Sequence, residues 1–140
     1  MYNSGINKFW GSFYMDEMEL YLKKYNFEKQ LKALKKELKN KTIIVYGTGA
    51  LFQAVLKNYD LSGLNIIGIS DRKYQVEDNA NYEFNYKVIR REDIVKYNPD
   101  CILIAIKMFL PVLNNFSKEF VGTKLLPLVD KPFWTLLKEI

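Results

Sequence analysis

The sequence predicts an α/β fold, a doubly wound parallel sheet of five strands with helices on both faces. Apolar, β-branched runs recur through residues 41–140, and stretches of helical periodicity separate them. This alternation is typical of parallel strands joined by helical crossovers. The most apolar run, residues 101–106, has no polar face, as expected for a strand buried on both sides.

The same patterns place the individual elements. We expect strands over residues 42–46, 65–70, 86–89, 101–106 and 124–129. Helices are expected over residues 50–58, 92–97, 108–120 and 132–140. Pro111 and Pro132 are compatible with helices, because proline is tolerated in a first turn. The polar stretch 71–85 is expected as a loop, and the strand order as 3-2-1-4-5.

The first forty residues differ from the rest, so we divide the chain into an extension, 1–40, and a domain, 41–140. Residues 16–39 have helical periodicity, with one apolar face made of Phe27, Leu31, Leu34 and Leu38. Asn26 could instead begin a second short helix. Aromatic residues are concentrated before Asn26, namely Tyr2, Phe9, Trp10, Phe13, Tyr14, Tyr21 and Tyr25. The extension is either a dimerisation arm or folded back on its own sheet.

Composition excludes several kinds of chemistry. The chain of 140 residues has no histidine and one cysteine, Cys101. An internal disulfide, a Cys-His nucleophile pair and a histidine or Cys-rich metal site are therefore excluded, and no metal is expected. No apolar stretch approaches the length of a membrane span, and no signal peptide is recognisable. We expect a cytoplasmic protein.

One motif carries chemistry: Gly47-Thr48-Gly49 directly follows the first strand and opens the first helix. In that context the first glycine permits a tight turn and the second lets a pyrophosphate approach the backbone at the helix N-terminus. Asp71 ends the second strand, where an acidic residue hydrogen-bonds a ribose hydroxyl. These features predict a Rossmann-like nucleotide-binding crevice. The alternative is that both glycines only form a turn and Asp71 caps a loop.

Three further residues belong to the predicted site. Phe52 stands where the third glycine of the motif is expected, so its ring either displaces the helix or lies over the pocket. Arg72 could meet a 2′-phosphate, which would favour NADP over NAD, or lie in a solvated turn. Lys107 follows the fourth strand beside the topological switch point and could contact a pyrophosphate or a sugar.

The series of motifs resembles the small Rossmann-like domains of polysaccharide-biosynthesis proteins. The resemblance covers about residues 41–130 and is carried by 41–49, by Gly68-Ile69-Ser70-Asp71, by 86–94 and by 100–106. It includes the CoA-binding-like N-terminal domain of nucleotide-sugar epimerases and dehydratases, and related domains of sugar O-acyltransferases and C-methyltransferases. The resemblance implies binding of NAD(P) or a nucleotide-sugar, or an accessory role without chemistry of its own.

We therefore expect an accessory nucleotide-binding protein of sugar-nucleotide or surface-polysaccharide biosynthesis. Whether it is itself an enzyme stays open, because no positioned acid–base pair is visible. The alternative is a scaffold with a vestigial crevice that forms a homodimer through residues 1–40. The net charge of +5 is concentrated in residues 17–41, which contain eight lysines. A solvated helix face explains these lysines, so no nucleic-acid partner is expected.

Overall fold

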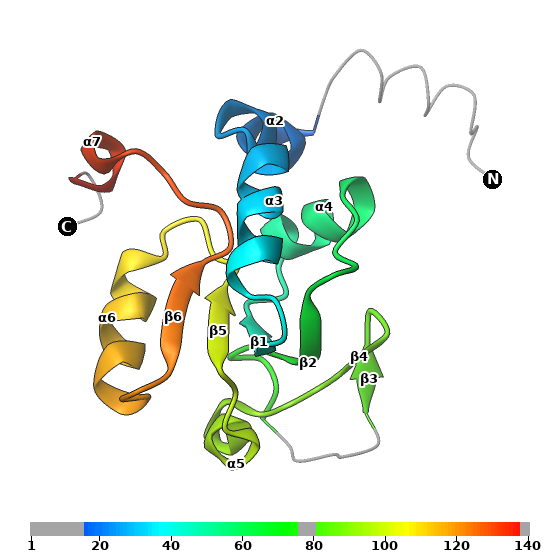
Figure 1. Cartoon of the computed structure of the whole chain (residues 1–140), viewed down its shortest axis with the longest axis vertical. Helices are drawn as coiled ribbons and strands as arrows, with labels where there is room; N and C mark the ends of the chain where they lie inside the picture. Colours follow the sequence, from blue (N-terminus) through cyan, green and yellow to red (C-terminus); the bar gives the residue numbers. More distant parts are fainter. Residues whose placement is uncertain (1–15, 76–80, 138–140) are drawn as a thin grey trace.

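Four parallel strands form the central sheet of the computed structural model, which describes residues 16–75 and 81–137. They are β1 (Thr42–Tyr46), β2 (Asn65–Ser70), β5 (Cys101–Ile104) and β6 (Lys124–Pro127). Their order across the sheet is β2-β1-β5-β6 (Figure 1). With helices on both faces, this is an α/β arrangement that is compatible with a Rossmann-like fold.

The predicted third strand, residues 86–89, does not form a full strand of this sheet. Its first half is β4 (Tyr86–Lys87), which pairs antiparallel with β3 (Tyr82–Glu83). Phe84 and Asn85 connect them with φ of 55° and 67°, values typical of a two-residue hairpin turn. Only an isolated parallel bridge, Ile69 to Val88, joins this segment to β2. The Ile89 N–H donates to the Ile69 carbonyl at 2.8 Å, so this segment lies beside β2, but a fifth full strand is not confirmed.

The other predicted elements are present. Helix α4 (Ala50–Asn58) follows β1, and α6 (Leu110–Glu119) follows β5 with Pro111 in its first turn. Strands β1 and β2 and helix α4 have the predicted bounds, whereas β5, β6 and α6 are shorter than predicted. The predicted helix 92–97 is a 3-10 turn, Arg91–Asp93, that continues into α5 (Ile94–Tyr97). The last helix among the described residues is α7 (Phe133–Leu136), which lies within the predicted helix 132–140.

Residues 16–39 form two helices, so the two-helix interpretation of this segment is the one observed. They are α2 (Glu17–Lys24) and α3 (Phe27–Glu37), separated by Asn26 with a left-handed φ of 50°. The side chain of Asn26 makes no capping hydrogen bond, so its contribution is its backbone conformation. The first five aromatic residues, Tyr2 to Tyr14, lie outside the described residues, so their role in dimerisation stays a prediction.

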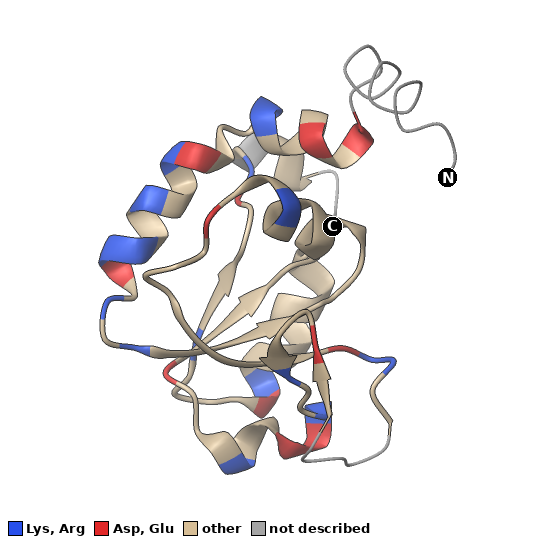
Figure 2. Ribbon diagram, turned by 90° about the vertical axis from the view of Figure 1, so that its right-hand side faces the viewer, with Lys and Arg blue, Asp and Glu red and all other residues tan. Residues whose placement is uncertain are grey.

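The core has two parts, one on each face of the sheet. Helices α2, α3 and α4 cover one face, where Phe27, Leu31 and Leu34 pack with Ile43 and Leu103. Helices α5 and α6 cover the other face. The described part of the extension, residues 16–40, therefore packs onto the domain that follows it, while basic residues recur along the exposed side of α3 (Figure 2). Within the described ranges, no helix has both the length and the apolarity needed to cross a bilayer.

Candidate functional site

A crevice of about 520 Å³ opens at the carboxyl ends of β1, β2 and β5. Parallel sheets of this kind bind ligands at that edge. Five of the seven predicted site residues line it: Gly47, Gly49, Asp71, Arg72 and Lys107. The rest of its lining is mainly apolar and comes from Met18, Tyr46, Ala50, Leu51, Ala105, Ile106 and Val112.

The two glycines have different roles in the turn after β1. Gly47 has φ of 108°, and a Cβ there would lie 2.8 Å from the carbonyl oxygen of Ala105. The backbone N–H of Gly47 donates to the carbonyl of Ser70 at 2.8 Å, which fixes the turn against β2. A Cβ on Gly49, in contrast, would meet no atom within 4 Å. Gly47 is thus needed for the turn, whereas Gly49 leaves space in the crevice.

The start of α4 faces this space. Gly49 is the N-cap residue and supplies no capping side chain, and the first turn of α4 contains no acidic residue. Backbone N–H groups in the first turn of a helix have no partner within the helix and favour a negative charge. An anion placed beside Gly49 would meet bare backbone.

Asp71 also helps to build the turn. Its Oδ2 accepts hydrogen bonds from the Thr48 backbone N–H at 2.7 Å and from the Thr48 hydroxyl at 3.1 Å. Its Oδ1 accepts the Lys73 N–H at 3.0 Å. Partial burial alone would raise the pKa of Asp71, but these hydrogen bonds outweigh burial and lower it. The ionised carboxylate retains lone pairs for a ligand hydroxyl, since it can accept about four hydrogen bonds.

Thr48 and Phe52 do not line the crevice. Thr48 is fully buried, and its hydroxyl accepts a hydrogen bond from Tyr74 at 3.3 Å. Phe52 is also fully buried. The centroid of its ring lies 6.2 Å from the ring centroid of Phe84 and 6.4 Å from that of Tyr86. The ring of Phe52 belongs to the core beneath the β3–β4 hairpin rather than to the lining of the pocket.

Lys107 connects the crevice to the N-terminal helices. Its Nζ lies 3.8 Å from Oε1 of Glu17 and 5.0 Å from the ring centroid of Tyr21. Met18, from the same helix, lines the crevice. The place of these α2 residues beside the crevice was not predictable, because nothing in their local pattern indicates that the helix reaches the glycine turn.

Two further titratable side chains lie on strands β1 and β5. Tyr46 lines it, and burial raises the pKa of its hydroxyl despite the positive charge of Arg91. Burial also raises the pKa of the Cys101 thiol to about 12, so this side chain is an inert core residue. Among the described residues no three acidic or cysteine side chains group together as metal ligands.

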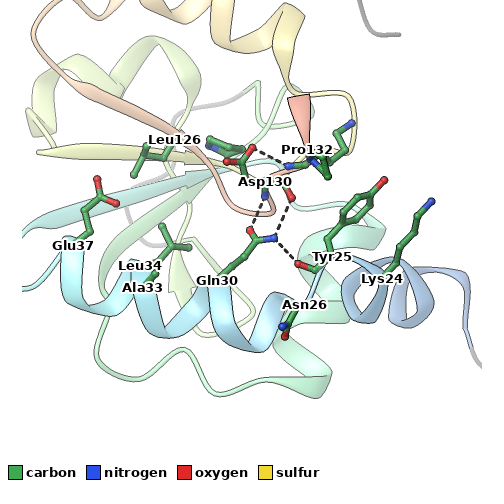
Figure 3. A pocket seen from close by; sticks show the side chains of 12 residues that line it. Lys24, Tyr25, Asn26, Gln30, Ala33, Leu34, Glu37, Leu126, Asp130 and Pro132 are labelled. Atoms are coloured by element: carbon green, nitrogen blue, oxygen red, sulfur yellow. Dashed lines mark hydrogen bonds between the residues drawn. The ribbon is translucent and has the colours of Figure 1, made fainter. Parts of the chain in front are cut away.

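A second cavity of about 550 Å³ lies between α3 and the chain that follows β6 (Figure 3). Gln30 spans it: the Gln30 Nε2 donates to the carbonyls of Tyr25 at 2.8 Å and Asp130 at 3.1 Å. The Gln30 Oε1 accepts the Asp130 N–H at 2.7 Å. In Figure 3 the side chains of Tyr25 and Glu37 lie on opposite sides of this amide.

A comparison with protein families gives one match. The family model described as C2185-like, N-terminal, matches residues 39–114, which is more than half of the chain. The match begins just before β1 and ends within α6, so it includes the glycine turn, Asp71 and Lys107. No curated protein and no solved structure matches the chain.

Proposed function

The chain belongs to the C2185-like N-terminal family, and we propose that it binds a nucleotide in the crevice beside Gly47 and Gly49. The ligand is NAD(P) or a nucleotide-sugar. The observation that carries this proposal is the open space at Gly49 in front of the uncapped start of α4. A phosphate there meets backbone N–H groups and the positive end of the helix dipole.

The other residues that line the crevice are suited to bind the ribose, the phosphates and the base of a nucleotide. Asp71 accepts hydrogen bonds from ribose hydroxyls, while Arg72 and Lys107 supply positive charge for phosphates. Apolar side chains such as Leu51, Ile106 and Val112 offer a surface for a base. Asp71 has two roles in this proposal, because it also holds the glycine turn through Thr48.

The protein acts as an accessory component of sugar-nucleotide or surface-polysaccharide biosynthesis in the cytoplasm. Support for this setting comes from the resemblance of residues 41–130 to domains of that metabolism. Binding without catalysis is consistent with a crevice lined by a single carboxylate, Asp71, among the described residues.

Thermal unfolding against a panel of NAD⁺, NADH, NADP⁺, CoA, UDP- and GDP-sugars, ATP and CTP tests the proposal. A ligand at about 100 times its dissociation constant stabilises the fold by roughly 2.7 kcal/mol. For a chain of this size the melting temperature then rises by several degrees. We expect a rise with one class of compound and none with the same compound on Gly49→Val, because the valine side chain fills the phosphate position.

Two controls sharpen this test. Gly49→Val should unfold near the wild-type temperature without ligand, since a Cβ at Gly49 meets no neighbouring atom. Lys107→Met should reduce the ligand-induced rise, whereas Lys118→Met, on the exposed end of α6, should leave it unchanged. A flat panel at millimolar ligand would rule out the proposed function and favour an interaction protein.

A further inference from the structure

The crevice and the second cavity share a wall. Lys131 lines the second cavity, and its Nζ donates at 2.8 Å to the backbone carbonyl of Lys107, which lines the crevice. Tyr25, also in the second cavity, packs edge-on against Tyr21 with ring centroids 4.9 Å apart. Tyr21 lies under the ammonium group of Lys107. Two lysines and two tyrosines thus lie at the boundary between the cavities.

The two lysines concentrate positive charge at this wall. Burial lowers the pKa of Lys131 first, and the charge of Lys107 lowers it further, against the opposing effect of Asp130. The ion pair of Lys107 with Glu17 is long, and Glu17 is 83% exposed, so water screens it strongly. Because the Lys131 Nζ lies 2.8 Å from the Lys107 carbonyl, both positive charges belong to this boundary, where an anion would be favoured.

The two cavities differ in chemistry. The crevice has apolar side chains suited to a base, whereas the second cavity contains the amide of Asn26 and the phenol of Tyr25. Its charged lining balances, with two cationic and two anionic side chains: Lys24, Lys131, Glu37 and Asp130. Neutral hydrogen-bonding groups and carboxylates suit an uncharged, hydroxyl-rich group.

We infer that the two cavities form one bipartite site for a nucleoside diphosphate-sugar. The nucleoside lies in the crevice, the diphosphate runs from the start of α4 to Lys107 and Lys131, and the sugar lies in the second cavity beside Tyr25 and Asp130. This inference rests on the proposed function and narrows its ligand, because it selects a nucleotide-sugar over NAD(P).

Calorimetric titration of the full chain tests the inference with matched pairs: UDP against UDP-glucose, and GDP against GDP-mannose, with NAD⁺ as a further compound. We expect one sugar conjugate to bind at least about tenfold tighter than its diphosphate, since two or more added hydrogen bonds contribute about 1 kcal/mol each. Tyr25→Phe and Asp130→Asn should each remove roughly fivefold of that difference and leave the affinity for the diphosphate unchanged.

Lys131→Met should lower the affinity for the diphosphate and for its sugar conjugate equally, because both ligands place a phosphate at the shared wall. The matched controls are Tyr82→Phe on the exposed hairpin and Lys118→Met on α6, and neither should change any affinity.

The outcomes separate the two proposals. A diphosphate that binds as tightly as its conjugate, or a preference for the conjugate that survives Tyr25→Phe and Asp130→Asn, overturns the bipartite site and leaves nucleotide binding intact. Tight binding of NAD⁺ with no binding of sugar conjugates would likewise overturn the bipartite site and leave nucleotide binding intact. If none of the compounds binds, the proposed function fails, and the bipartite site fails with it.

Discussion

Gly47 and Gly49 are two positions apart and differ in their tolerance of a side chain. Gly47→Ala should lower the free energy of unfolding by about 2 kcal/mol or more, because φ of 108° is strained for an L-residue and the Cβ meets Ala105. Gly49→Ala should change it by less than about 0.5 kcal/mol, since nothing lies near the new methyl group. Urea unfolding of both variants checks this, and equal losses would contradict the geometry of the turn.

The ionised carboxylate of Asp71 should make the stability of the glycine turn depend on pH. Its pKa is lowered in the folded protein, so its contribution to stability is complete above the unfolded pKa of about 3.9 and is lost as the pH falls through the lower, folded value. Asp71→Asn should therefore be less stable than the wild type at pH 7 and closer to it near pH 3. Urea unfolding at several pH values measures this difference, and a gap that is constant with pH would exclude this role of Asp71.

Helix α4 and the β3–β4 hairpin are linked through Phe52. Its ring is fully buried and lies near Phe84 and Tyr86, so Phe52→Ala should cost about 3–5 kcal/mol of unfolding free energy. Replacing Phe52 by glycine, the residue that the motif has at this position, should therefore also destabilise the fold. Denaturant unfolding tests the magnitude, with Phe84→Ala as the exposed partner, which should cost less. A loss below about 1 kcal/mol in Phe52→Ala would contradict this packing.

The same elements indicate how far local pattern predicts structure. Strong periodicity was sufficient for β1, β2 and α4, whose residue ranges match the predictions. It was not sufficient for residues 86–89, where left-handed backbone at Phe84 and Asn85 forms a hairpin and a single bridge, from Val88, reaches β2. In the candidate site, the glycine turn and Asp71 could be predicted from their positions directly after the first and second strands. Met18 was not, because it enters the crevice from a helix outside the motif.

At the scale of the whole molecule, the described part of the extension belongs to the hydrophobic core on one face of the sheet. Five apolar residues from the described part of the extension are buried: Leu22, Phe27, Leu31, Leu34 and Leu38. Each contributes about 1.5–3 kcal/mol, and their sum is comparable with the total stability of a typical domain.

A chain that begins at Lys41 should therefore lack a cooperative thermal transition. Circular dichroism during heating measures this, with the full chain as the control. A cooperative transition in the shortened chain would establish residues 41–140 as an independent domain.

The sequence by itself determined the alternation of strand and helix, the glycine turn and the acidic residue after β2, because each depends on local periodicity or on one backbone conformation. The tertiary structure alone decided three features. Phe52 is buried under the hairpin, α2 borders the crevice through Met18 and contacts Lys107 through Glu17, and the Lys107 carbonyl meets Lys131 between two cavities. These are contacts between residues distant in the chain, and they depend on how the helices pack on the sheet, which no local pattern specifies.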